Sequence, residues 1–203
     1  MRAVWSGRRT AILLALHPLS IVALGSRNRG NLHSANASTI VRLTTLDPTT
    51  LHALLTASQR EGFRFLERLC EEWENGCNRF DKPGEALFGL SLGAELLAIG
   101  GINRQDKSTG RLRRFYVLPS HRRRGLGSRL LRHILTHAAG HFRRVILRTT
   151  TDAANRFYLA QGFKRAQDSC DATHGMELPC AEFSGRRKRR QQASSSTRTR
   201  SRA

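Results

Sequence analysis

A glycine-containing loop is the clearest candidate for chemistry in this 203-residue chain. It reads R-R-R-G-L-G-S over residues 122–128 and lies between a predicted strand and a predicted helix. Gly125 and Gly127 lack side chains at positions where a ligand could approach the backbone. The first amides of a helix have no intrahelical acceptor, and the helix dipole favours an anion beside them. The loop therefore predicts a pyrophosphate site, to which three arginines add positive charge.

The loop differs from two familiar phosphate-binding motifs. It matches neither G-x-G-x-x-G nor G-x-x-x-x-G-K-[ST], which disfavours a dinucleotide site or a P-loop. Taken alone, R-x-x-G-x-G is a weak signal, and an isolated match is more often a basic turn before a helix.

Two further motifs accompany the loop. Residues 114–119 read R-F-Y-V-L-P, and residues 154–163 read A-N-R-F-Y-L-A-Q-G-F. The three motifs, in this order, resemble the GNAT acetyltransferase superfamily over roughly residues 38–180. The resemblance implies a single α/β domain with a mixed, mainly antiparallel central sheet flanked by helices. It also implies an acetyl-CoA-dependent N-acetyltransferase that acts on a primary amine by direct attack in a ternary complex.

The resemblance implies a cofactor site built from three segments. The amides of the loop would hold the CoA pyrophosphate, and the backbone of the preceding strand would bind the pantetheine arm and the thioester carbonyl. Thr151 stands where many relatives have Asn, so it caps a helix or contacts CoA. The implied cofactor-binding residues are Phe115, Tyr116, Val117, Arg122, Arg123, Arg124, Gly125, Leu126, Gly127, Ser128 and Thr151.

Tyr158 matches the family's tyrosine near the CoA sulfur, and it is the predicted catalytic residue. The reaction expels a thiolate, and a nearby phenol can protonate it as a general acid. A preset backbone N–H can stabilise the charge that develops on the carbonyl oxygen. The alternative is that Tyr158 is a half-buried aromatic on the helix.

The sequence leaves the base and the acceptor open. Candidates for the general base are Glu85, Glu95, His121 and His174, and a water relay could serve instead. Several acids in and just after the second helix could favour a cationic acceptor or form a solvated helix face: Glu61, Glu67, Glu71, Glu72 and Glu74.

Hydrophobic periodicity predicts the elements that must position these residues. Strands are expected over 39–46, 86–92, 96–102, 111–118, 143–149 and 172–178. Helices are expected over 50–58, 61–73, 126–139 and 152–161, the last one capped by Thr151 or Asp152. The segment around residues 93–95 predicts a hairpin.

Charge separates the ends of the chain from its middle. The net charge is +20, but residues 1–37 carry five arginines and no acid, and residues 186–202 carry eight Lys or Arg and no acid. We expect an extension over 1–37, disordered or targeting-like, the acetyltransferase domain over 38–184, and a basic disordered tail over 185–203. The tail keeps open a nucleic-acid-binding protein on an acetyltransferase-like scaffold, and a non-catalytic acyl-CoA-binding module is a third alternative.

Four cysteines with no zinc-type spacing favour reduced thiols, no bound metal and a cytoplasmic location. No stretch of the sequence reaches the roughly 20 apolar residues that a membrane span needs.

Overall fold

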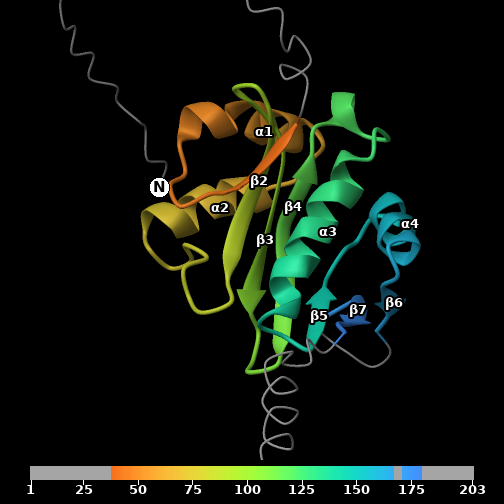
Figure 1. Cartoon of the computed structure of the whole chain (residues 1–203). Coiled ribbons are helices and arrows are strands. Elements are labelled where there is room, and N and C mark those ends of the chain that lie inside the picture. The colour runs from red at the N-terminus through yellow and green to blue at the C-terminus, as the bar shows by residue number, and fades with distance from the viewer. Residues whose placement is uncertain (1–37, 167–170, 180–203) are drawn as a thin grey trace, which may run out of the picture. The chain divides into compact units, whose positions relative to one another are not determined.

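A seven-stranded sheet organises the computed structural model, which describes residues 38–166 and 171–179 (Figure 1). The strand order is β1-β2-β3-β4-β5-β7-β6. Every neighbouring pair is antiparallel except β4 and β5, which run parallel. The strands are β1 (Thr39–Arg42), β2 (Ala86–Leu92), β3 (Glu95–Arg104), β4 (Thr109–Val117), β5 (Arg144–Leu147), β6 (Lys164–Arg165) and β7 (His174–Glu177).

Helices cover both faces of this sheet (Figure 1). They are α1 (Pro48–Arg60), α2 (Phe65–Glu74), α3 (Leu126–Ala139) and α4 (Asp152–Ala160), with a 3-10 turn over Pro119–His121. Helix α3 packs on β3 and β2 from one side, and α1 and α2 contact β3 and β4 from the other. The mixed, mainly antiparallel sheet and its flanking helices confirm the predicted fold class.

Local sequence explains where the helices begin. The Asp47 carboxylate accepts from the amides of Thr49 and Thr50, and Pro48 occupies the first turn, where no amide is needed. Thr151 caps α4 by accepting from the Ala154 amide at 3.3 Å, which settles the choice between Thr151 and Asp152.

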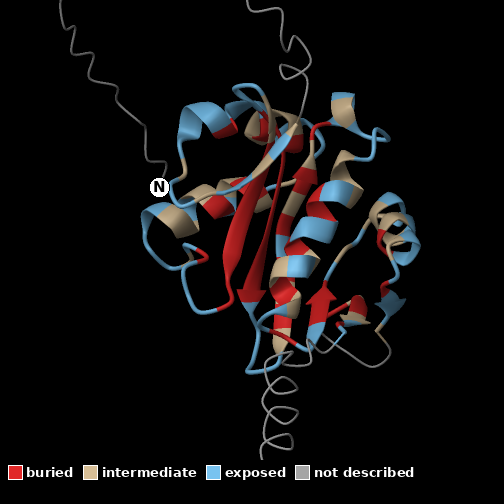
Figure 2. Ribbon diagram, in the orientation of Figure 1, coloured by how far each residue is buried: buried red, intermediate tan, exposed pale blue. Residues whose placement is uncertain are grey.

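The core lies where the central strands meet the helices (Figure 2). Strand β3 is buried from Leu96 to Asn103. Two adjacent glycines make close packing possible there: a Cβ on Gly100 would meet the Phe115 ring, and one on Gly101 would meet Phe80. These contacts show which face each side chain occupies, since Phe115 lies on the α3 side and Phe80 on the α1–α2 side.

Most predicted elements are present, with shifted ends. Helix α3 has the predicted bounds, and β2 matches residue for residue. The helix expected from residue 61 begins at Phe65 because Gly62 has a φ of 78°, which interrupts helical geometry. The two-residue strand β6 and the 3-10 turn were not predicted.

The expectations for residues 1–37 and 185–203 lie outside the described residues. Within the described ranges, no helix is both long enough and apolar enough to span a membrane.

Candidate active site

The parallel strands β4 and β5 separate halfway along β4. They pair only from Thr109 to Arg111 on β4, opposite Arg144 to Ile146 on β5. Beyond that point, residues 112–117 have no strand partner on the β5 side among the described residues. Backbone amides and carbonyls require hydrogen-bond partners, so this edge can receive an extended ligand. The predicted segment Phe115–Val117 lies in this opening.

A β-bulge decides which face of the sheet each aromatic residue of β4 occupies. Tyr116 pairs with Ile99 and Arg113 with Gly101, so two residues of β4 stand opposite Gly100. Arg114 takes the left-handed conformation at the bulge, with a φ of 57°. Phe115 consequently stacks on Phe157 of α4 at 5.8 Å.

The predicted pyrophosphate loop has the backbone of an anion site. Arg123 and Gly125 adopt φ values of 61° and 79°, and such left-handed residues turn successive amides in one direction. The amides of residues 123–128 have no acceptor among the described residues. A Cβ on Gly125 would meet nothing within 4 Å, so open space lies beside it. A Cβ on Gly127 would meet the Val117 and Phe157 side chains at 3.4–3.6 Å.

Arg122 differs from the rest of the loop. Its amide donates to the Pro119 carbonyl, and its side-chain Nε donates to the Val117 carbonyl at 3.0 Å. The two terminal nitrogens donate to the two Glu61 carboxylate oxygens at 2.7 and 2.6 Å, which is a bidentate ion pair. The Arg122 side chain therefore fixes the end of β4 and the turn after α1, while the amides that follow have no acceptor among the described residues.

Glu61 was considered from the sequence only among the acids that could favour a cationic acceptor, and the cluster that it forms with Arg122 and Tyr116 was not predicted. Its carboxylate also accepts from the Tyr116 hydroxyl at 2.6 Å, and the bonds from Arg122, ahead of that from Tyr116, lower the pKa of Glu61. The Arg122 guanidinium lies 5.3 Å from the centre of the Tyr116 ring. No local motif signals this cluster, because Glu61 and Arg122 are 61 residues apart.

Tyr158 lies on the other side of the opening, inside a group of aromatic rings. Its side chain is nearly buried, and its ring lies 6.2 Å from Phe115, 5.6 Å from Phe163 and 6.1 Å from His174. Burial raises the pKa of Tyr158, so the phenol stays protonated at neutral pH. The placement brings the predicted acid within ring contact of the predicted cofactor strand.

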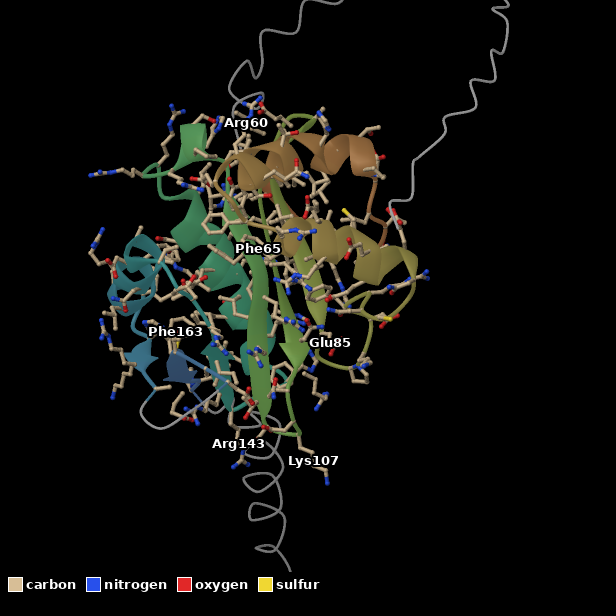
Figure 3. The ribbon with its side chains drawn as sticks, turned by 180° about the vertical axis from the view of Figure 1, so that it is seen from behind. Arg60, Phe65, Glu85, Lys107, Arg143 and Phe163 are labelled. Atoms are coloured by element: carbon tan, nitrogen blue, oxygen red, sulfur yellow. The ribbon has the colours of Figure 1, made fainter. Side chains whose placement is uncertain are left out.

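Three of the candidate bases occupy structural positions. Glu85 is buried and accepts from the Arg104 amide. Figure 3 shows it farther down the sheet than Phe65. Glu95 is exposed at the start of β3. Both ring nitrogens of His174 are engaged, one with Asn155 and one with Thr173, each at 2.9 Å.

His121, the fourth candidate, hydrogen-bonds to Ser120 at 2.9 Å at the start of the loop. Three of the acids considered for a cationic acceptor instead form ion pairs: Glu61 with Arg122 at 2.6 Å, Glu67 with Arg64 at 3.0 Å, and Glu72 with Arg114 at 2.6 Å.

Comparisons with known proteins identify the family. The model of the acetyltransferase (GNAT) family matches residues 50–163. A search among curated proteins finds no match. A solved structure from Exiguobacterium sp. 255-15, assigned as an acetyltransferase, is 32% identical, with a TM-score of 0.62 over 70% of this chain and 93% of that one.

Two more distant structures share the fold. An acetyltransferase from Streptococcus agalactiae 2603 is 19% identical, with a TM-score of 0.59 over 70% of this chain and 98% of that one. A GNAT acetyltransferase from Elizabethkingia anophelis, solved with acetyl-CoA bound, is 16% identical, with a TM-score of 0.50 over 70% of this chain and 98% of that one. The family model, the Exiguobacterium relative and the opening between β4 and β5 lead to one conclusion: this chain belongs to the GNAT family of acetyltransferases.

Proposed function

We propose that the protein transfers an acetyl group from acetyl-CoA to a primary amine by direct attack in a ternary complex. The observation that carries this proposal is the opening between β4 and β5, which ends beside the amides of residues 123–128. Family membership supports acyl transfer in general, and the Elizabethkingia neighbour binds acetyl-CoA.

The chain's residues fit CoA in three segments. The outward amides of Arg123, Arg124, Gly125, Leu126, Gly127 and Ser128 would bind the pyrophosphate. The unpaired edge of Phe115, Tyr116 and Val117 would bind the pantetheine amides and the thioester carbonyl. Arg122 would act indirectly, since its nitrogens hold Glu61 and the Val117 carbonyl. Thr151, which caps α4, would set the end of that helix beside the cofactor.

The reaction forms a C–N bond and breaks the C–S bond. The amine nitrogen attacks the thioester carbonyl carbon, and the sulfur leaves with the bonding electron pair. The nitrogen loses its proton to solvent, directly or through water. Tyr158 donates its phenolic proton toward the departing sulfur. Because burial keeps this phenol neutral, its proton is available throughout the physiological pH range.

Calorimetric titration tests the cofactor, and thiol release tests the reaction. Acetyl-CoA should bind the full-length chain, whereas NAD and ATP should not. Addition of primary amines should then release CoA thiol together with the N-acetylated product. A folded protein that does not bind acetyl-CoA would refute the proposal, and binding without thiol release for any amine would indicate an acyl-CoA-binding module.

A further inference from the structure

Arginines line the face of β4 that is turned toward α2, where acetyl transfer itself requires no positive charge. Residues directly opposite each other in an antiparallel pair share a face. Arg113 stands opposite Gly101, whose missing Cβ points at Phe80, and Arg111 stands opposite Asn103. Asn103 in turn bonds to Asn78, beyond the end of α2. Arg111 and Arg113 therefore belong to the α2 side of the sheet.

The bulge adds a third guanidinium to this face. Arg114 is 8% exposed, and one of its terminal nitrogens donates to Glu72 of α2 at 2.6 Å. Its Nε is buried and has no hydrogen-bond partner among the described residues. The second oxygen of Glu72 already accepts from Asn78. Glu72 therefore leaves the buried Nε of Arg114 without an acceptor among the described residues.

The charge at Arg113 is still less compensated. Desolvation, followed by the charge of Arg114, lowers the pKa of Arg113, and only Glu72 acts against them among the main contributors. Arg111 and Arg68 add further repulsion. Arg113 is only partly desolvated, because the residue as a whole is still exposed to solvent. A cluster of like charges beside a single carboxylate is stabilised by an anion that binds to it.

Arg113 and Arg114 lie close enough to Tyr116, beside the proposed point of attack, for one ligand to contact both places. Arg113 and Tyr116 stand opposite Gly101 and Ile99, which are two residues apart on β3. A strand advances about 3.3 Å per residue, so Arg113 is roughly 7 Å from Tyr116 along the sheet, and Arg114 in the bulge lies between them. Tyr116 is on the same face, where its hydroxyl bonds to Glu61 and its ring packs on Phe65 at 6.0 Å. Figure 3 shows Phe65 over this part of the sheet. One molecule a few bonds long can reach both places.

We infer that the acceptor is an amine that also carries an anionic group, in the simplest case a carboxylate, which binds at Arg113 and Arg114 while the amine reaches the thioester beside Val117. This inference rests on the proposed acetyl transfer and narrows its substrate class. It replaces the cationic acceptor considered from the acid-rich second helix, because Glu61 and Glu72 are paired with arginines.

Matched substrates test the inference. The probes are 4-aminobutyrate and 6-aminohexanoate, each compared with its uncharged primary amide. Acetyl transfer by the wild-type chain should show a kcat/KM at least about tenfold higher for the better carboxylate than for its amide, since hydrogen bonds to charged groups are the stronger ones. Arg113→Gln should lower kcat/KM about tenfold for that carboxylate, mainly through KM, and less than about twofold for the amide.

Arg143→Gln is the matched control. It removes the same charge from an exposed arginine at the far end of the sheet, near Lys107 in Figure 3. It should change neither substrate's kinetics. Equal kcat/KM for acids and amides, or equal losses for both in Arg113→Gln, would overturn the inference.

A binding measurement separates this inference from the proposed transferase activity. Calorimetry with 6-aminohexanoate in the presence of saturating CoA requires no turnover. Binding that Arg113→Gln weakens and Arg143→Gln does not would support the anion site even if no amine is acetylated, in which case the proposed reaction alone fails. Binding that is undetectable, or unchanged in Arg113→Gln, would overturn the anion site while acetyl-CoA titration still tests the transferase.

Discussion

The chain's two tyrosines stand on opposite sides of the opening in the sheet, and their surroundings differ sharply. The Tyr116 hydroxyl donates to Glu61 inside a charged cluster with Arg122. Tyr158 lies among aromatic rings and has no charged partner among the described residues. Burial is the main cause of the raised pKa of both phenols, but at Tyr116 the bond to Glu61 adds to it. A tyrosine whose proton is already bound to a carboxylate is suited to holding structure, and one without such a partner is suited to donating its proton.

The largest effect is expected from Tyr158→Phe. Loss of the proton donor should lower kcat by roughly tenfold to a hundredfold, while acetyl-CoA affinity stays within about twofold. Steady-state kinetics and calorimetry measure the two quantities. An unchanged kcat would remove Tyr158 from the reaction and end the contrast between the tyrosines.

Gly125→Val tests whether the pyrophosphate of the cofactor binds at the loop between the 3-10 turn and α3. The φ of 79° disfavours a β-branched residue, and the new side chain would enter the open space where the pyrophosphate is proposed to bind. Acetyl-CoA affinity should fall about tenfold or more.

Gly76→Val is the control for this prediction. Gly76 has a similar φ of 75°, lies after α2, and meets only the end of Arg79 at 4.0 Å. The Gly76→Val variant should be less stable than wild type but should keep its acetyl-CoA affinity. Equal losses of affinity in both variants would show that backbone strain, and not the loop, is responsible.

Tyr116→Phe should give the opposite balance to Tyr158→Phe. Removing the hydroxyl leaves Glu61 with the Arg122 pair, so the free energy of unfolding should fall by about 1 kcal/mol. We expect kcat to stay within about threefold of wild type. Urea denaturation measures the free energy of unfolding of both variants, and steady-state kinetics measure their kcat. A larger loss of kcat in Tyr116→Phe than in Tyr158→Phe would reverse the assignment of the two roles.

The smallest expected effect is on the pH dependence of stability and concerns His174, whose ring lies 6.1 Å from the Tyr158 ring. Burial lowers the pKa of His174 below its unfolded value of about 6.5. The unfolded state therefore takes up the proton first, so this contribution to stability is complete above that value and declines as pH falls toward the folded pKa.

Melting curves between pH 7.5 and 5.5 test this pH dependence. His174→Gln should show a shallower decrease in Tm than wild type. His52→Gln, which replaces an exposed histidine on α1, should keep the wild-type slope. Identical slopes in all three proteins would contradict the prediction.

Features that depend on neighbours in the sequence could be predicted. Helix α3 was correct at both ends because its buried residues Leu130, Leu131, Ile134 and Ala138 recur at helical spacing. The glycine loop was recognisable because left-handed backbone and close ligand approach both favour glycine.

Features that depend on distant pairing could not be predicted. Glu61 meets Arg122 only because the turn after α1 folds against the end of β4. The bulge at Arg114 has no glycine to signal it, and β6 has two residues, too few to show a period. For the same reason the sequence left open whether these acids favour a cationic acceptor or form a solvated helix face, since the partners of Glu61 and Glu72 come from other elements.

The bulge at Arg114 changes which face of the sheet the residues after it occupy. In a regular strand, Arg113 and Phe115 would share one face, and Arg114 and Tyr116 the other. The extra residue instead sends Phe115 to α4 and leaves Tyr116 beside Arg113. Deleting one residue here would exchange the faces of the two aromatic rings. One inserted residue thus determines which aromatic ring packs against α4 and which one reaches Glu61 on the opposite face.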